Sequence, residues 1–264
     1  MNGVFPRFPV LILVVATVAI LAWGQQKQPV EVDPEVWKLT FVDEFDGGKL
    51  DREKWNPYDP WEVVRNGELQ GYVPNSIFFK DGVLRIRASK QQSLYDGETR
   101  AYSSGIITTK SKFSQKYGRF EICCKVPKGK GLWPAFWMLP EPLAWPPEID
   151  VMELLGHETN VAYLTHHWPH PRLKDESESI TKDFKGPDFS AGFHTFAVEW
   201  EPDEIRWFVD GVQRHRAKKQ IPDVPMFLLV NLAVGGGWPG NPNEKTEFPA
   251  YFEVDYVKAW KKIR

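Results

Sequence analysis

Short runs of alternating apolar and polar residues, separated by turn sequences, cover most of this chain and restrict its fold more than any other feature. Residues 84–88 alternate in this way directly after the pair Asp81-Gly82. A two-residue period places the apolar side chains on one face of a strand, and Asp-Gly is a preferred hairpin turn. Because residues 36–260 contain no long stretch with a helical period, the sequence predicts an all-β fold.

The same pattern predicts antiparallel hairpins further along the chain. Residues 196–200 and 205–209 alternate, and the second run ends at Asp210-Gly211. Many short strands at this spacing indicate a sandwich or barrel, and about 230 residues exceed a minimal immunoglobulin-like domain. We therefore predict a jelly-roll β-sandwich of two antiparallel sheets. The polar and charged residues 169–187 are predicted to form a surface loop.

The N-terminus predicts a targeting segment. Arg7 precedes an apolar run at residues 10–23, which is followed by Gly24. A helix needs about 20 apolar residues to cross a bilayer, so this shorter run is typical of a signal peptide. We expect a signal peptide over residues 1–24, a linker over 25–35, one folded domain over 36–264 and a secreted protein. A retained membrane anchor is the alternative, and only then would the protein contact a membrane.

Charge and cysteine content exclude several classes of protein. The formal net charge is -2 and the basic residues are scattered, so we expect no nucleic-acid partner. Cys123 and Cys124 are adjacent and point to opposite faces of a strand, which disfavours a disulfide between them. The chain has 12 Trp and 17 Phe, and we expect most of these rings to pack in the core. The others are candidates for binding the apolar faces of a neutral ligand, and we expect a monomer.

Three acids within six residues form the most informative local motif. Glu148 and Asp150 share one face of a strand because their separation is even, whereas Glu153, five positions after Glu148, would point the other way. A β-bulge at Val151-Met152 would return Glu153 to the face of the other two acids. The sequence therefore predicts three converging carboxyl groups that depend on a bulge.

On one face of a bulged strand, the side chains of Glu148 and Glu153 can approach the carboxyl separation of about 5–5.5 Å found in a retaining glycosidase. In such an enzyme one carboxylate attacks the anomeric carbon and the other acid protonates the leaving oxygen. Crowded like charges also raise the pKa of at least one acid, which keeps it protonated near neutral pH. Two alternatives stay open at this point: a solvated outer face that carries the acids, and ligation of calcium by the three carboxylates.

Motifs along most of the chain resemble glycoside hydrolase family 16, in particular its laminarinase-like branch of endo-β-1,3-glucanases. The resemblance extends from Leu39 to Trp260. Branches of this family that lack the bulge omit the residue at the position of Met152. The motifs occur in the family's order, at residues 41–47, 66–70, 117–121, 132–138, 148–153, 165–168, 231–240 and 254–257.

The resemblance implies a concave cleft across a jelly-roll sandwich, with residues 36–264 as the catalytic domain. It implies Glu148 as nucleophile, Asp150 as its helper and Glu153 as acid/base, with no cofactor required for catalysis. It also implies a structural calcium ion held by Glu44 and Asp255. The implied substrate-binding residues, for whose tryptophans core packing is the alternative, are Asn66, Glu68, Trp133, Trp137, Trp145, His167 and Trp238.

The function implied is internal cleavage of β-1,3-glucan or mixed β-1,3-1,4-glucan, with the polysaccharide as the binding partner. Alternatives are a non-catalytic glucan-binding module, a transglycosylase, and a hydrolase of another β-linked polysaccharide such as agarose or carrageenan. The chain departs from the family at residues 102–106, where related sequences often carry an arginine and this one has none. Its absence bears on how sugars are recognised.

Overall fold

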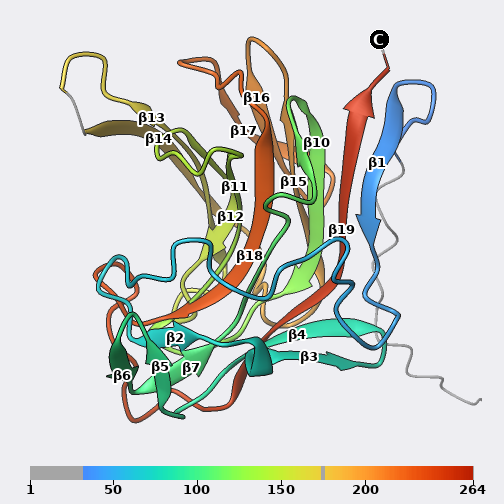
Figure 1. Cartoon of the computed structure of the whole chain (residues 1–264). Coiled ribbons are helices and arrows are strands. Elements are labelled where there is room, and N and C mark those ends of the chain that lie inside the picture. The colour runs from blue at the N-terminus through green and yellow to red at the C-terminus, as the bar shows by residue number, and fades with distance from the viewer. Residues whose placement is uncertain (1–31, 174–175, 264) are drawn as a thin grey trace, which may run out of the picture.

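The computed structural model describes residues 32–173 and 176–263, which fold into two large antiparallel sheets that face each other (Figure 1). The predicted all-β fold with two antiparallel sheets is confirmed. The predicted signal peptide and most of the predicted linker lie outside the described residues. Among the residues that were placed, no helix is long and apolar enough to cross a membrane.

One large sheet, which we call the back sheet, has eight strands in the order β17-β16-β15-β10-β19-β4-β3, with β1 also paired to β19. Its strands are β1 (Trp37–Asp43), β3 (Ile77–Lys80), β4 (Val83–Ala88), β10 (Gly118–Lys125), β15 (His194–Trp200), β16 (Ile205–Val209), β17 (Val212–Ala217) and β19 (Ala250–Lys262).

The other large sheet, which we call the cleft sheet, has seven strands in the order β14-β13-β12-β11-β18-β8, with β9 also paired to β18. Its strands are β8 (Ile106–Thr108), β9 (Ser114–Gln115), β11 (Leu132–Pro140), β12 (Glu148–Leu154), β13 (Val161–Pro169), β14 (Ser177–Lys185) and β18 (Met226–Val234).

Smaller elements border one end of the sandwich. A parallel pair joins β2 (Gln70–Tyr72) to β7 (Tyr102–Ser104), and a hairpin joins β5 (Ser93–Tyr95) to β6 (Glu98–Arg100). A short 3-10 helix, η1 (Pro74–Ser76), leads into β3. Figure 1 shows β2, β5, β6 and β7 together below the cleft sheet.

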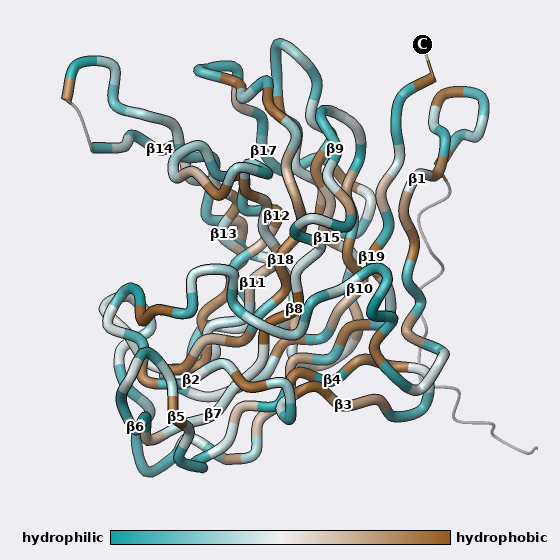
Figure 2. Tube along the Cα trace, viewed as in Figure 1, coloured by the Kyte–Doolittle hydropathy of each residue, from teal (hydrophilic) through white to brown (hydrophobic). Residues whose placement is uncertain are grey.

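The main core lies between the two large sheets. Phe136 and Val230 of the cleft sheet are fully buried in one cluster with Phe120, Phe196 and Val254 of the back sheet. Hydrophobic residues follow the facing strands, whereas loops and much of β14 are polar (Figure 2). Burying this apolar surface is the dominant favourable term for the fold. The inner faces of both sheets are therefore structural, and the outer face of the cleft sheet remains available for function.

The predicted hairpins are confirmed. Residues 84–88 lie in β4, and residues 196–200 and 205–209 lie in β15 and β16. Asp210 has φ 51° and Gly211 has φ 75°, the left-handed conformation that two-residue hairpin turns require. The two cysteines are buried and free, as expected from their spacing.

The predicted surface loop at residues 169–187 is wrong over its second half, because Ser177–Lys185 form β14 and pair with β13 along nine residues. This strand is polar because it lies at the edge of the cleft sheet and most of its side chains are at least partly exposed. Charged edge strands of this kind also protect a sheet against pairing with other chains.

His166 of β13 points into the core and carries a testable consequence for stability. Its side chain is fully buried and neither ring nitrogen has a hydrogen-bond partner among the described residues. Burial, with a smaller contribution from His167, lowers the pKa of His166 to about 4. In the unfolded chain, His166 has its ordinary pKa of about 6.5 and is protonated below that pH, whereas in the folded chain it stays neutral down to about pH 4. The free energy of unfolding therefore falls as the pH drops from about 6.5 to about 4.

We expect this single residue to make the protein about 2 kcal/mol less stable at pH 5 than at pH 7.5. The measurement is urea denaturation at the two pH values for the wild type and for His166→Leu, which should lose that share of the pH dependence. The exposed His157 provides a matched control, because His157→Leu should keep the dependence. Equal pH dependence in the wild type and His166→Leu would contradict the linkage.

Candidate active site

Strand β12 carries the acids, and its pairing is interrupted by one extra residue. On β11, the adjacent residues Trp137 and Phe136 pair with Asp150 and Met152, so Val151 has no partner there. The pairing with β13 shifts at the same place, between Asp150 and Glu153. The β-bulge predicted at residues 151–152 is confirmed.

The bulge turns two successive side chains into the core. Val151 and Met152 are both fully buried in the cluster between the sheets, whereas Glu148, Asp150 and Glu153 all line one cavity on the opposite face. An extra residue restores the two-residue alternation that the five-residue spacing would otherwise break. Because the acids face a cavity and Asp150 is only 2% exposed, the alternative of a solvated outer face is wrong.

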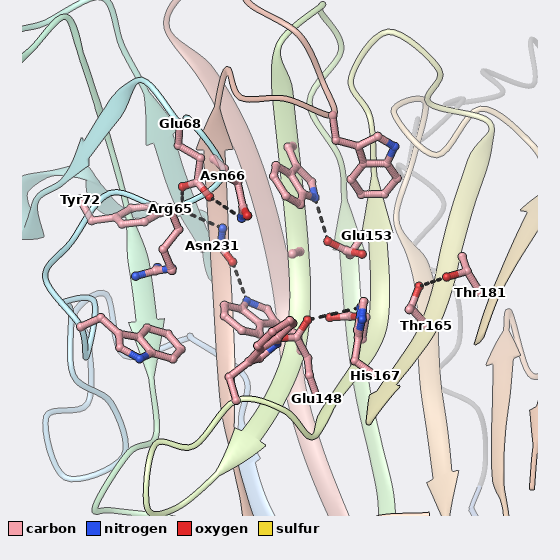
Figure 3. Close-up of a pocket in the computed structure, with 18 residues that line it drawn as sticks. Arg65, Asn66, Glu68, Tyr72, Glu148, Glu153, Thr165, His167, Thr181 and Asn231 are labelled. Atoms are coloured by element: carbon pink, nitrogen blue, oxygen red, sulfur yellow. Dashed lines mark hydrogen bonds and ion pairs between the residues drawn. The ribbon is translucent and has the colours of Figure 1, made fainter. Parts of the chain in front are cut away.

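Each outer acid accepts a hydrogen bond from a tryptophan. The indole Nε1 of Trp145 donates to Glu148 Oε2 at 3.0 Å, and that of Trp133 donates to Glu153 Oε1 at 3.0 Å (Figure 3). An indole N–H can only donate, so it fixes one oxygen of each carboxyl group and leaves the other available. These two tryptophans therefore orient the acids as well as lining the cleft.

His167 of β13 lies beside the first two acids. Its Nε2 is 3.3 Å from Asp150 Oδ2 and 3.7 Å from Glu148 Oε1, because Glu148 and His167 are opposite each other in the pairing of β12 with β13. From the core side, the indole of Trp207 in β16 of the back sheet donates a hydrogen bond to the backbone carbonyl oxygen of Asp150 at 2.8 Å. His167 thus faces the cleft and its neighbour His166 faces the core, which identifies the histidine of the site.

Burial dominates the acid–base properties of the cluster. It raises the pKa of Glu148 and Asp150, and the charges of neighbouring acids add to this effect. It also raises the pKa of Glu153 to about 8, with a further contribution from Glu148. At His167, burial lowers the pKa, but the interaction with Asp150 and the negative charges of Asp150 and Glu148 together outweigh it and raise the pKa. At neutral pH, Glu153 therefore keeps its proton. Its neighbours Glu148 and Asp150 cannot both be fully ionised.

The cavity around these acids has a volume of about 710 Å³. Trp145 is 52% exposed and Trp238 is 42% exposed, so core packing does not explain either ring. Trp137 packs on one side against a second small core cluster and faces the cavity on the other. The structure places every predicted substrate-binding residue in the lining: Asn66, Glu68, Trp133, Trp137, Trp145, His167 and Trp238.

Glu68 collects hydrogen bonds at one wall of the cleft. Its carboxyl group accepts from Asn66 Nδ2 at 3.2 Å, Gln70 Nε2 at 2.6 Å and the Tyr72 hydroxyl at 3.3 Å. Burial raises the pKa of Glu68 even though these donors oppose the shift. Glu68 is therefore a buried organising group of the wall, with less freedom to meet a ligand than the sequence suggested.

This network extends to the platform residue Trp137. Its indole donates to Asn231 Oδ1 at 2.7 Å, and Asn231 Nδ2 donates to the Tyr72 hydroxyl at 3.0 Å. The donors and acceptors thus run in one direction from Trp137 through Asn231 and Tyr72 to Glu68 (Figure 3). Asn231 and Tyr72 hold the ring of Trp137 in place from β18 and β2.

A second aromatic group stands on the side of Glu153. The ring of Trp133 meets that of Trp238 edge to face at a centroid distance of 5.2 Å, and Tyr163 meets Trp238 at 4.7 Å. Edge-to-face packing fixes rings in space. Trp238, which lies outside any strand, is therefore positioned by residues of β11 and β13.

Several lining residues were missed from the sequence. Thr165 and Asn231 lie inside recognised motifs without any signal of their own, Tyr72 lies just after one, and Thr181 falls in the segment that was predicted to be a loop. Only their pairing in the sheet brings them to the cleft. The missed residues are Trp61, Arg65, Tyr72, Ala135, Thr165, Thr181, Asn231 and Ala233.

Among the described residues, one group of His, Cys, Asp and Glu side chains is close enough to hold a metal ion. Glu148, Asp150 and His167 each present a ligand atom within 4.8 Å of the others. Glu153 is not part of this group, which differs from the set of three carboxylates considered for calcium. The contacts of Trp145 and His167 already account for the orientation of the acids without an ion.

The predicted calcium ligands Glu44 and Asp255 do not form a site by themselves. The Glu44 carboxylate is 2.8 Å from Lys258 Nζ, and burial raises the pKa of Asp255 while a hydrogen bond with Cys123 lowers it. Calcium takes six to eight oxygen ligands, so backbone carbonyls would have to supply most of them. The calcium ion stays a prediction.

Comparison with known proteins agrees with this geometry. The family model described as glycosyl hydrolases family 16 matches residues 72–258. The catalytic domain of an endo-1,3-beta-glucanase (laminarinase) from Thermotoga petrophila is 39% identical, with a TM-score of 0.79 over 86% of this chain and 99% of that chain. The predicted jelly-roll sandwich is thereby confirmed.

Two further relatives are similar over most of this chain. LamA of Zobellia galactanivorans, solved in complex with laminaritriose and laminaritetraose, is 30% identical, with a TM-score of 0.75 over 84% of this chain and 98% of that chain. Endo-1,3-1,4-beta-glycanase ExsH of Rhizobium meliloti is 35% identical in an alignment of 251 residues that covers 87% of this chain and 53% of that protein. The chain spans about half the length of the first curated relatives it matches. On the family match and these identities, the chain belongs to glycosyl hydrolase family 16.

Proposed function

We propose that this protein is a retaining, endo-acting glycoside hydrolase that cleaves β-1,3-glucan or mixed β-1,3-1,4-glucan. The observation that carries the proposal is the bulge in β12, which brings Glu148, Asp150 and Glu153 together in an aromatic-lined cleft. Acids paired across a scissile bond are the machinery of glycoside hydrolysis. The similarity to laminarinases and to a 1,3-1,4-glycanase supports the choice of linkage.

In the first step, a Glu148 carboxylate oxygen attacks the anomeric carbon while Glu153 gives its proton to the departing glycosidic oxygen. One C–O bond forms as the other breaks, which leaves a glycosyl ester on Glu148. Asp150, whose Oδ2 lies 3.3 Å from His167 Nε2, adjusts the charge on Glu148. In the second step, Glu153 takes a proton from water, whose oxygen attacks the same carbon and releases Glu148.

The lining favours a neutral polysaccharide. The rings of Trp133, Trp137, Trp145 and Trp238 offer flat apolar surfaces, and the acids of the site would repel sulfate or carboxylate groups. A laminarinase of similar structure was solved with laminaritriose and laminaritetraose, which are neutral β-glucan fragments. We infer that the cleft of this protein takes the same class of ligand.

Incubation with laminarin, lichenan, agarose and carrageenan, followed by an assay of new reducing ends, tests the proposal. We expect new ends from laminarin or lichenan and a rapid fall in chain length, as internal cleavage requires. Binding without cleavage would favour a glucan-binding module, and products longer than the starting oligosaccharide would favour a transglycosylase. Cleavage of agarose or carrageenan alone would overturn the proposed substrate.

The acid/base role assigned to Glu153 predicts the alkaline limit of activity. Because its pKa is about 8 and the first step needs its protonated form, kcat/KM should fall as the pH rises through about 8. The measurement is kcat/KM on a soluble laminari-oligosaccharide between pH 4 and 10. A constant kcat/KM across pH 7 to 9.5 would remove Glu153 from this role.

The bulge itself predicts the effect of a deletion. Removing Met152 leaves the acids at an even spacing, so an ordinary strand would still place them on one face. We expect the deletion to lower stability by about 2–5 kcal/mol through loss of a buried side chain, yet to keep at least about tenfold more activity than Glu153→Gln. A folded deletion variant no more active than Glu153→Gln would contradict this account of the spacing.

Three further proposals rest on the sequence and do not concern the reaction. They are secretion after removal of residues 1–24, a monomeric state and a bound calcium ion. The mass of the mature protein gives the N-terminus, and light scattering gives the oligomeric state. A rise in melting temperature with added Ca²⁺ would support the ion, and Asp255→Asn should abolish that rise.

A further inference from the structure

The cleft has a second wall that the proposed chemistry does not use, formed by Trp61 and Arg65 in the segment between β1 and β2. Both residues line the same cavity as the acids. The ring of Trp61 is parallel to that of Trp137 within 9°, at a centroid distance of 6.1 Å. Arg65 Cζ lies 4.4 Å from the centre of the Trp61 ring, a cation–π contact. The aromatic lining therefore continues past Trp137 to a charged planar group.

One buried carboxylate holds this wall together. Asp59, only 1% exposed, receives a hydrogen bond from Arg65 Nη1 at 2.8 Å and another from the Tyr95 hydroxyl, both on Oδ2. Its other oxygen accepts from the Trp61 backbone N–H at 3.3 Å. A carboxylate bound in this way fixes the ring, the guanidinium and the backbone relative to one another.

The hairpin of β5 and β6 supports the wall from behind. Asp96 Oδ2 accepts a hydrogen bond from the Val64 backbone N–H at 3.0 Å, and Arg100 Nη2 donates to the Glu68 carbonyl oxygen at 2.5 Å. These contacts tie the segment that carries Trp61 and Arg65 to a regular element. A preorganised surface loses less entropy when a ligand binds than a mobile one does.

Arg65 lines the cavity and does not use all of its N–H donors within the described part of the chain. Its side chain is 26% exposed, and Nη1 donates to Asp59 and to the Val63 carbonyl oxygen. Within residues 32–173 and 176–263, no group accepts a hydrogen bond from its Nε or Nη2. Because Asp59 already balances the charge of Arg65, these N–H groups suit neutral hydroxyls better than a sulfate or carboxylate.

We propose that Trp61 and Arg65 form a distal subsite for one more neutral sugar unit of the chain being cleaved. This inference rests on the proposed function and extends it to the length of substrate that the cleft recognises. Nε and Nη2 of Arg65 donate to the hydroxyls of that unit, and Trp61 holds the guanidinium plane. Related sequences often carry an arginine at residues 102–106, where this chain has none and Ile106 is buried. In the proposed subsite, Arg65 supplies a cationic donor from a different segment.

The test compares a short and a long substrate, because only the long one reaches a distal subsite. We measure kcat/KM on laminaritriose and on laminariheptaose for the wild type, Arg65→Met and Trp61→Ala. Loss of hydrogen bonds from a charged donor should lower the ratio of long to short by about tenfold in Arg65→Met. Arg65→Lys, which keeps the charge but not the planar fork, should lose part of the ratio.

Leu94→Ala is the matched control, because Leu94 lies on the same supporting hairpin and is 76% exposed outside the cleft. It should leave the ratio unchanged. An unchanged ratio in Arg65→Met and Trp61→Ala, or an equal loss on both substrates with the fold intact by circular dichroism, would overturn the subsite. If the wild type cleaves neither oligosaccharide nor any glucan, the proposed function fails instead, so the two failures are distinct.

Discussion

Glu148→Gln should reduce hydrolysis of laminarin by about 10⁴-fold or more while leaving the fold intact. The amide has nearly the same shape and can still accept the N–H of Trp145, but it cannot form the glycosyl ester that the retaining mechanism needs. Reducing ends measured over a long incubation give the residual rate, and circular dichroism with a thermal melt checks the fold.

The exposed Glu53 provides the matched control, since Glu53→Gln makes the same chemical change away from the cleft and should retain full activity. Active Glu148→Gln would remove Glu148 from the nucleophile's role. If Glu148→Gln is inactive as expected, titration with laminarihexaose, monitored by tryptophan fluorescence, shows whether the cleft of the variant still binds the sugar chain.

Glu153→Gln should reduce hydrolysis of laminarin by about 10²–10⁴-fold, the usual contribution of a general acid. The reason is that a glutamine cannot protonate the leaving oxygen. A substrate such as a dinitrophenyl β-glucan oligosaccharide, whose leaving group needs no proton, should form the glycosyl ester at nearly the normal rate. The measurement is the initial burst of dinitrophenolate, followed by slow turnover.

This result separates the two acids, because Glu148→Gln should show no burst on the same substrate. The limit near pH 8 should also disappear from the burst rate in Glu153→Gln, since the group with that pKa is no longer present. A burst rate as low as the steady-state rate would mean that Glu153 does more in the first step than protonate the leaving oxygen, which would contradict its assigned role.

Local pattern was sufficient to predict much of the framework. Alternation with a period of two and Asp-Gly turns located β4, β15 and β16, because side-chain direction in a strand depends only on sequence parity. The same parity argument required the bulge at residues 151–152, which the register of β12 with β13 contains. Where the information is local, the sequence was enough.

Pairing between distant segments decided the rest. Residues 177–185 lack an alternating apolar face, yet they form β14 because β13 offers an edge with unpaired backbone groups. His166 and His167 could not be told apart by residue type, and only the register of β13 sends the first into the core and the second to Glu148.

The acids of the site were thus determined by the sequence, and its walls by the tertiary structure. Spacing along one strand brought Glu148, Asp150 and Glu153 to one face, because strand geometry is set within the segment itself. The wall of Trp61 and Arg65 depends on Asp59 and on Tyr95, about thirty residues further along the chain. Contacts of that range leave no period in the sequence, so only the folded chain reveals them.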